Sequence, residues 1–281
     1  MTYTRACEIK PGVTFPEDMR RYALRVEYKG AEFRGFQKQA SATETVQRYL
    51  EQALSFVADE AIVTKCAGRT DAGVNATAQW IHFDTLSDRD LVAWTKGVNS
   101  RMPRGIRVNY ATRVDPLYHA RFSAKARQYC YVLHRSNTPS SLLHELVTYL
   151  PYDVDLADMN QAAAHLIGEQ DFSAFRASGC QAASPIRTIT DAKWTAHGDF
   201  LAFHIKANAF LYHMVRNIVG SLLEVGRGVQ APKWVAELLV SRDRTLAAAK
   251  APACGLYFVG VQYPAEFAIP ADPILPAWLN A

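Results

Sequence analysis

The feature that most constrains the fold of this chain is a change in hydrophobic spacing that recurs twice in the same order. Within residues 22–28, the apolar side chains of Tyr22, Leu24, Val26 and Tyr28 fall on alternate positions, which is typical of a half-buried strand. Within residues 46–57, apolar residues recur at helical spacing. Further strand patterns at 61–66, 78–84 and 106–112, with a helical pattern at 88–99, give the first half the order β-α-β-β-α-β.

The second half repeats this order of elements without repeating the sequence itself. Its patterns predict a strand, a helix, a hairpin around Gly198, two further helices and a closing strand. These elements are expected at residues 127–134, 155–168, 187–207, 213–226, 232–239 and 255–263.

This element order is typical of ferredoxin-like and RNA-recognition folds. We therefore predict an α+β protein of two ferredoxin-like, RRM-like α/β halves, whose antiparallel sheets form a central sheet with an active-site cleft between the domains. The expected divisions are an N-terminal tail, an N-terminal domain, a C-terminal domain and a C-terminal tail, at residues 1–20, 21–118, 119–265 and 266–281.

The composition of the chain indicates its cellular compartment. No apolar run approaches the length of a membrane span, and the N-terminal residues lack the apolar core of a secretory signal. The 5 cysteines are scattered and show no metal-like spacing, so we expect reduced thiols. These observations predict a cytoplasmic protein with no membrane partner.

Basic residues are concentrated in one part of the chain, although the net charge is only +4. Residues 101–135 contain 8 Lys and Arg but a single acid, Asp115. Arginine outnumbers lysine by 21 to 10, and the guanidinium group binds phosphate oxygens bidentately. A basic segment of this kind indicates nucleic acid as a partner, while an ordinary solvated basic face explains the charge equally well.

The stretch AGRTDAGVNATAQ at residues 67–79 surrounds one acid, Asp71, with small residues and Arg69. It connects two predicted strands, and glycines at 68 and 73 permit tight backbone turns. The alanines leave room above the carboxylate for a flat, bulky group. The neighbouring arginine favours an ionised carboxylate, which can serve as a nucleophile or base. Thr-Asp-Ala-Gly is also ordinary turn chemistry, so the residues alone leave a simple turn open.

Two later segments carry further candidates. Arg216 lies at the edge of the apolar face of the helix predicted in FLYHMVRNIVGSLLEVG, where a cation either extends outward to water or finds an anionic partner. Both orientations stay open, the second being a pair with Asp71 across the cleft. In HARFSAKARQYCYVLH, basic residues interleave with Phe122, Tyr129 and Tyr131. Aromatic rings stack on unpaired bases, while a buried sheet face explains the two tyrosines equally well.

Several other chemistries lack their sequence signals. The chain has no zinc-ligand spacing, no nucleophile-elbow serine, and no Walker or dinucleotide-binding motif. We therefore expect either an enzyme without metal or cofactor, or a binding protein.

GRTDAGVNA closely resembles the catalytic motif of the tRNA pseudouridine synthase I family, which isomerises uridines at positions 38, 39 and 40 in the anticodon stem-loop of tRNA. Other segments resemble that family in its order, and the resemblance extends from about residue 20 to residue 264. They are EYKGAEFRGFQKQ, TVQRYLEQAL, HARFSAKARQYCY, DFSAFRASGCQAASPIRTI, FLYHMVRNIVGSLLEVG and APACGLYFVGVQYP.

The resemblance implies a role for each matching residue. Asp71 matches the essential aspartate, Arg69 the arginine that displaces the target base, and Tyr129 the tyrosine that stacks on the target uracil. Arg216 matches the arginine that pairs with the aspartate, and Leu256 an apolar residue of the pocket. The family forms homodimers and needs no metal or organic cofactor.

This chain departs from the family pattern at two visible positions, Asn75 in place of histidine and Phe36 in place of tryptophan. The departures put the packing of the loops in doubt rather than the catalytic set.

Two other functions remain as alternatives. A non-catalytic RNA-binding protein of two RRM-like halves explains the basic segment and the aromatic residues, but gives no reason for Asp71 or Arg216. A metal-dependent nuclease is disfavoured because the sequence lacks clustered carboxylates.

Overall fold

A computed structural model describes residues 14–39 and 43–279 of the chain. Most of the tail predicted at residues 1–20 therefore lies outside the described residues. The chain divides into two compact units. Unit 1 contains the described residues of 14–125 together with Phe258–Ile274, and unit 2 contains Ala126–Tyr257 together with residues 275–279. Each unit combines mostly antiparallel strands with a few helices, which confirms the α+β class.

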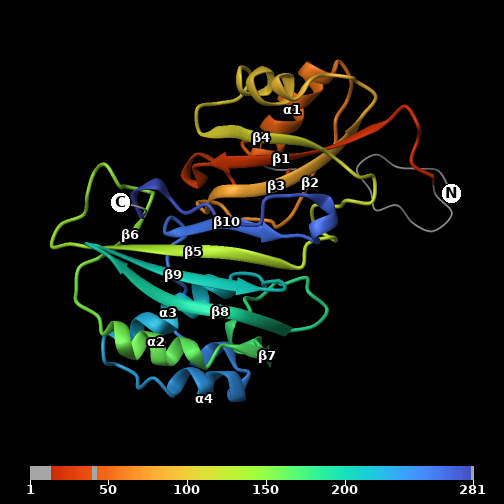
Figure 1. The fold of residues 1–281 in the computed structure, drawn as a ribbon. Helices are drawn as coiled ribbons and strands as arrows, with labels where there is room; N and C mark the ends of the chain where they lie inside the picture. Colours follow the sequence, from red (N-terminus) through yellow and green to blue (C-terminus); the bar gives the residue numbers. More distant parts are fainter. Residues whose placement is uncertain (1–13, 40–42, 280–281) are drawn as a thin grey trace. The chain divides into compact units, whose positions relative to one another are not determined.

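Unit 1 is built on a sheet with the strand order β4-β1-β3-β10, and β2 pairs with β3. Helix α1 (Val46–Ala58) and a helical turn at Ala93–Gly97 lie along one side of this sheet (Figure 1). The strands are β1 (Arg20–Tyr28), β2 (Lys65–Cys66), β3 (Asn75–Thr85), β4 (Ile106–Val114) and β10 (Leu256–Gln262).

The core of unit 1 lies on both faces of the sheet. On the helix side, Tyr22 of β1 and Phe83 of β3 pack against Trp94, with ring centroids 5.3 and 5.0 Å from the tryptophan ring. The predicted alternation is confirmed on this face. The opposite face, expected to meet solvent, is also covered near the start of β1, where Arg21 and Ala23 are buried.

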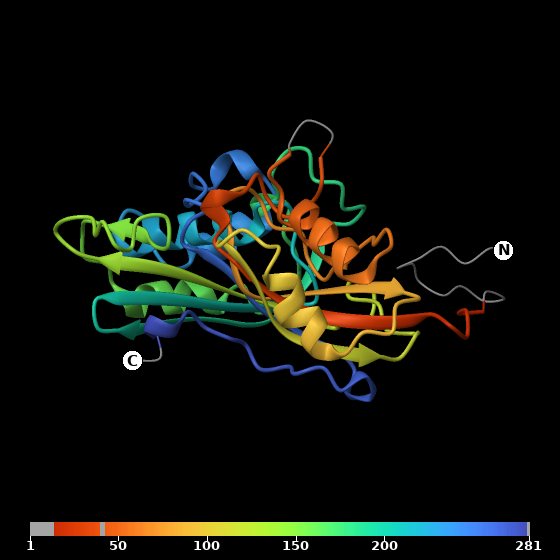
Figure 2. The ribbon, with the colours of Figure 1, turned by 90° about the horizontal axis from the view of Figure 1, so that it is seen from above.

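The strands of unit 2 follow the order β5-β9-β8-β7, and β6 pairs in parallel with β5. The hairpin of β8 and β9 turns at Gly198, whose φ is +56°, and its two strands run side by side in Figure 2. Three helices, α2, α3 and α4, accompany these strands (Figure 1). The elements are β5 (Ala126–Arg135), β6 (Thr148–Leu150), α2 (Leu156–Ala164), β7 (Gly168–Asp171), β8 (Ile186–His197), β9 (Phe200–Ala207), α3 (Met214–Gly226) and α4 (Trp234–Ser241).

The predicted order of the long elements is confirmed in both halves, whereas the short strands β6 and β7 were not predicted. The predicted helix at 155–168 ends earlier, at Ala164, because Gly168 adopts φ +104° and begins β7. The units also divide at Lys125–Ala126 rather than at residues 118–119.

The closing strand and the chain after it differ most from the expected arrangement. Most of β10 belongs to unit 1, next to β3, rather than to the C-terminal unit. Part of the predicted tail at 266–281 is packed: the Ile274 amide donates to the Val259 carbonyl at 2.8 Å and Leu279 is buried, whereas residues 270–273 are exposed. Burial of the Ile269 and Leu279 side chains explains why parts of the Pro-rich segment lie against the protein.

Among the helices of the described residues, none has the length and apolar character required to cross a bilayer.

Candidate active site

Asp71 lies in the loop that connects β2 to β3 in unit 1, with its side chain half-buried, while Arg69 is exposed. Bonds close the loop at both ends. The Gln79 side chain donates to the Gly68 carbonyl at 2.6 Å, and the Val74 amide donates to the Asp71 carbonyl at 3.2 Å. The loop is therefore a turn, as its composition allowed, and the carboxylate is carried on a fixed backbone.

A second segment, residues 30–36, is bound directly to this loop. The Gly73 amide donates to the Gly30 carbonyl at 3.2 Å, and the Gly30 amide donates to Oδ1 of Asn75 at 2.7 Å. A Cβ atom at Gly30 would lie 2.2 Å from the Val74 carbonyl oxygen, so only glycine fits this approach. The residue 30–36 segment and the Asp71 loop therefore pack together and support each other's backbone.

A buried hydrogen-bond network supports the loop from below. The Tyr28 hydroxyl bonds to the Thr70 hydroxyl at 2.7 Å, next to Asp71 in the chain. Burial raises the pKa of the Tyr28 hydroxyl, which keeps this group protonated and able to donate. Gln79 contacts the same tyrosine hydroxyl at 3.5 Å and also holds Gly68.

The two departures from the family pattern both serve this packing. Phe36 is buried, its ring lies 6.1 Å from the Tyr28 ring, and its amide donates to the Thr70 carbonyl at 3.1 Å. Asn75 is buried and holds Gly30. Loop packing, which these substitutions put in doubt, is therefore complete with the residues that this chain has.

Replacing Asn75 with Ala is expected to destabilise the protein by about 1–3 kcal/mol, because the buried Gly30 amide would lose its acceptor. The loop that carries Asp71 should become less ordered as a result. Urea unfolding would measure the loss, with Asn109→Ala as a control at an exposed asparagine of the same unit. An equal effect of the two substitutions would contradict the role given to the Gly30 bond.

In unit 2, Tyr129 and Arg216 are both buried. Tyr129 lies on β5, and its ring meets the edge of Phe210 with the centroids 5.0 Å apart. Tyr131, on the same strand face, is also buried, as expected. Arg216 lies on α3, and its Nε donates to the Ala251 carbonyl at 2.8 Å. Its side chain therefore does not extend outward to water, which removes one of the two orientations that the sequence left open.

Residues 251–256 connect the three unit 2 candidates. This segment accepts the bond from Arg216 at Ala251, and its Gly255 carbonyl accepts from the Val132 amide of β5 at 2.8 Å. Leu256 ends the segment and is buried. Arg216, Leu256 and the strand of Tyr129 are thus brought together. Asp71 and Arg69 belong to unit 1, and the Asp71–Arg216 pair stays a prediction.

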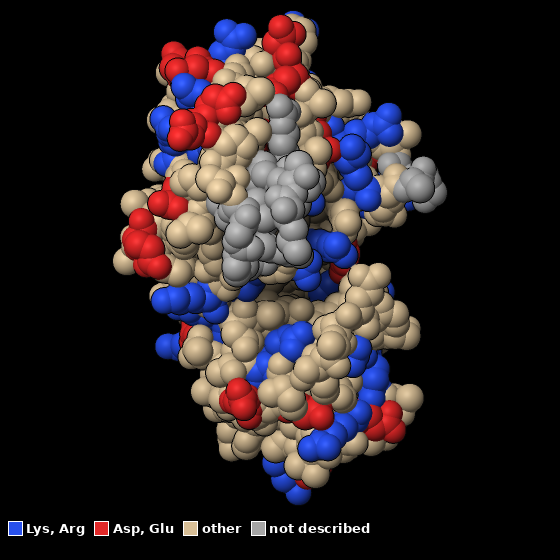
Figure 3. Space-filling model, turned by 90° about the vertical axis from the view of Figure 1, so that its right-hand side faces the viewer, with Lys and Arg blue, Asp and Glu red and all other residues tan. Residues whose placement is uncertain are grey.

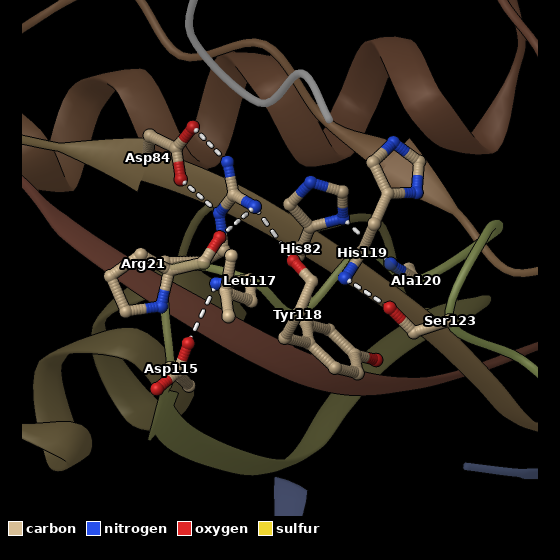
Figure 4. Close-up of polar contacts among 10 residues, drawn as sticks. Arg21, His82, Asp84, Asp115, Leu117, Tyr118, His119, Ala120 and Ser123 are labelled. Atoms are coloured by element: carbon tan, nitrogen blue, oxygen red, sulfur yellow. Dashed lines mark hydrogen bonds and ion pairs between the residues drawn. The ribbon is translucent and has the colours of Figure 1, made fainter. Parts of the chain in front are cut away.

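Sequence reasoning missed a polar cluster in unit 1, drawn in Figure 4. Arg21 and Asp84 are fully buried and form a bidentate ion pair, with Nε to Oδ1 at 2.7 Å and Nη2 to Oδ2 at 2.9 Å. The same guanidinium donates to the carbonyls of Pro116 and Tyr118 at 2.6 and 2.7 Å. Arg21 and Asp84 are direct neighbours across β1 and β3. The available signal was an arginine immediately before the strand predicted at 22–28 and an acid at the end of the one predicted at 78–84.

The cluster also fixes the segment HARF that begins at residue 119. His82 accepts a bond from the Ala120 amide at 3.1 Å, and its ring centroid lies 4.5 Å from that of His119. Burial, together with the nearby cations Arg21, Lys65 and Arg121, lowers the pKa of His119 to about 4. At neutral pH this histidine is therefore uncharged, and its Nδ1 accepts backbone N–H bonds from residues 121 and 122.

No group of three or more His, Cys, Asp or Glu side chains within 14–39 and 43–279 could hold a metal ion. Cations are plentiful at the surface instead. Six of the eight basic residues in 101–135 are exposed and the other two are half-buried. Lys and Arg side chains occur on both units over the face drawn in Figure 3, with Asp and Glu among them.

Comparison with known proteins identifies the family. The sequence model described as tRNA pseudouridine synthase matches residues 25–123 and 162–264, which is more than half of the chain. The chain belongs to this family. The matched ranges include Asp71, Arg69, Arg216 and Leu256, while Tyr129 falls between them.

Relatives in the tRNA pseudouridine synthase family align over almost their whole length. The tRNA pseudouridine synthase A of Vibrio cholerae strain O395 is 48% identical over 259 residues, covering 92% of this chain and 98% of the relative. The protein of that name from Aliivibrio fischeri strain MJ11 is 48% identical, covering 92% and 99%. That of Alcanivorax borkumensis is 45% identical, covering 93% and 98%.

Proposed function

We propose that this protein isomerises uridine to pseudouridine at positions 38, 39 and 40 in the anticodon stem-loop of tRNA, with Asp71 as the catalytic residue. The family match over residues 25–123, which includes the whole Asp71 loop, is the observation that carries this proposal. The names of the aligned relatives support the same activity. The bonds that fix the loop to Gly30 and Thr70 suit a carboxylate that must keep one position.

The reaction breaks the bond between N1 of uracil and C1′ of ribose, turns the base, and joins C5 to C1′; C5 then loses its proton and N1 gains one. It changes no oxidation state and transfers no group to another molecule, so the proposed chemistry uses no metal or organic cofactor. An ionised Asp71 attacks as a nucleophile or removes a ribose proton, and both routes are consistent with one fixed carboxylate. Arg69, exposed beside it, is suited to displace the base from its stack.

Unit 2 would bind the displaced uracil. Extruding a base from its helix costs a few kcal/mol, and an aromatic or apolar surface offsets that cost. Tyr129 and Leu256 supply such surfaces. Leu256 ends the segment 251–256, which binds Arg216 and is bonded to the strand of Tyr129.

We also propose the finer arrangement of two ferredoxin-like, RRM-like halves with Asp71 of one half paired to Arg216 of the other. The Ala251 carbonyl orients the buried guanidinium of Arg216, which suits a fixed ion pair with a carboxylate. A crystal structure in which the two side chains lie beyond ion-pair distance would contradict this arrangement. A homodimer in the cytoplasm completes the proposal, and sedimentation of the purified protein tests its subunit number.

Mapping pseudouridine in tRNA from cells that lack this protein tests the activity directly. We expect the modification to be absent at positions 38 to 40 and present elsewhere, and restored by the intact gene. Purified protein should form pseudouridine in an unmodified transcript with uridine at these positions. A transcript that stays unmodified would refute the proposed function.

Binding of tRNA is expected to weaken steeply as salt rises, because Lys and Arg contacts to phosphate release counterions. The exposed basic residues of 101–135 are the proposed contacts. Fluorescence anisotropy at several salt concentrations would give the slope, and each phosphate contact removed by an Arg→Gln substitution in this segment should reduce it by about 1. A flat response would mean that this segment does not follow the phosphate backbone.

A further inference from the structure

An exposed aromatic ring stands immediately before helix α3 in unit 2, four residues ahead of Arg216. Tyr212 is 45% exposed, although most large aromatic side chains of the chain are buried. Its ring stacks on that of His213, with centroids 3.8 Å apart and planes 27° from parallel. Among the described residues, no other ring contacts Tyr212. The tyrosine therefore has one face covered by an imidazole and the opposite face open to a further flat group.

The backbone at this ring is fixed on both sides. The Tyr212 amide donates to the Cys180 sulfur at 3.4 Å, and its carbonyl accepts from the Ala177 amide at 3.1 Å. His213 adopts a left-handed backbone conformation, with φ +59°, which is unfavourable for a residue with a side chain and is concentrated at functional sites. The structure thus fixes the backbone that carries the exposed ring, next to a residue with an unfavourable conformation.

Two arginines lie near the residues that hold this backbone: Arg176 immediately precedes Ala177, and Arg187, at the start of β8, interacts electrostatically with Cys180. Arg176 donates to the carbonyls of Cys180 and Ala182 at 2.9 and 2.7 Å. Arg187 donates to the Ser184 carbonyl at 2.9 Å. Burial lowers the pKa of Arg187, the nearby Cys180 thiol raises it, and the positive charge of Arg176 lowers it.

Neither arginine forms an ion pair with a carboxylate of the described residues. Arg176 also bonds to the Cys180 thiol, and this bond and its charge help to lower the pKa of that thiol. Two neighbouring cations without a carboxylate partner repel each other and attract an anion. An open aromatic face beside two such guanidinium groups is the combination by which proteins hold an unpaired nucleotide: the base stacks on the ring and the phosphate binds to arginine.

We propose that Tyr212, His213, Arg176 and Arg187 form a binding site for one unpaired nucleotide of the RNA substrate. The base stacks on the open face of Tyr212, and the arginines bind the adjacent phosphate. The site rests on the proposed function, because it takes tRNA as its ligand, and it assigns a role to residues outside the set inferred from the family. Loop nucleotides fit it, whereas base-paired nucleotides do not offer a free base face.

The test compares binding of a synthetic anticodon stem-loop RNA with binding of a fully paired RNA duplex of the same length. Tyr212→Ala is expected to raise the Kd for the stem-loop about tenfold and to leave the Kd for the duplex unchanged. Tyr212→Phe keeps the ring and should stay within about twofold of the wild type. Tyr152→Ala is the matched control, since Tyr152 is also exposed, at 37%, and also lies next to an arginine, Arg227.

Thermal unfolding of each variant separates a lost contact from a folding defect. An unchanged Kd in a folded Tyr212→Ala variant would overturn the site, and so would an equal loss in Tyr212→Phe, which would assign the effect to the hydroxyl. A loss that is the same for the duplex would mean a general effect on the surface rather than base stacking. Wild-type protein that forms no pseudouridine would refute the proposed function instead, so the two failures are distinguishable.

Discussion

Replacing Asp71 with Asn is expected to reduce pseudouridine formation by about 10²–10⁴-fold, the range found when a positioned catalytic acid or base is lost. The amide has nearly the shape of the carboxylate, so the loop held by Gly30, Thr70 and Asn75 should keep its bonds. It cannot act as an anionic nucleophile or remove a proton. Binding of tRNA should stay near the wild-type level, because the basic residues of 101–135 are untouched.

Asp115→Asn is the matched control for this substitution. Asp115 also lies in a loop of unit 1, where its carboxylate accepts a bond from the Leu117 amide at 2.7 Å, and the substitution removes the same charge. Single-turnover kinetics and tRNA affinity should be measured for both variants. Wild-type activity in Asp71→Asn would end the catalytic assignment. A loss of binding equal to the loss of activity would favour the non-catalytic RNA-binding alternative.

The long elements of the fold could be predicted because hydrophobic spacing is a local property. The alternation of Tyr22, Leu24 and Val26 places these side chains on the helix side of β1, whatever packs there. The position of β10 could not be predicted in the same way. Its neighbour β3 is far away in the sequence, and no local pattern states which strand lies beside which. The short strands β6 and β7 carry too few residues to show a period.

In the candidate site too, local features could be predicted from the sequence, whereas contacts between distant residues could not. The loop of Asp71 could be found by its composition, and the family resemblance assigned its acid. The bond from the Gly30 amide to Asn75 could not be predicted, because it joins residues 45 positions apart. Arg216 shows the limit most clearly: its position on an apolar helix allowed two orientations, and the Ala251 carbonyl, in a different segment, selects the buried one.

The buried pair of Arg21 and Asp84 should make the largest single contribution of any ion pair to the stability of unit 1. Both side chains are completely inaccessible to solvent. Replacing Asp84 with Ala would leave the guanidinium buried without its counterion, and breaking such a pair destabilises proteins by about 3–5 kcal/mol. Arg21 also holds the carbonyls of Pro116 and Tyr118, so the segment that leads to His119 should lose order as well.

Urea unfolding of Asp84→Ala and of Asp88→Ala measures this effect against an internal control. Asp88 pairs with Arg20 at 2.9 Å, but its side chain is 73% exposed, and solvent-exposed pairs contribute only about 0–1 kcal/mol. The same chemical change in the partners of two neighbouring β1 residues, Arg21 and Arg20, should therefore give very different losses in the free energy of unfolding. Replacing Arg21 with Met together with Asp84→Leu should recover much of the loss, since no unpaired charge remains buried. Equal losses for Asp84→Ala and Asp88→Ala would contradict the importance of burial here.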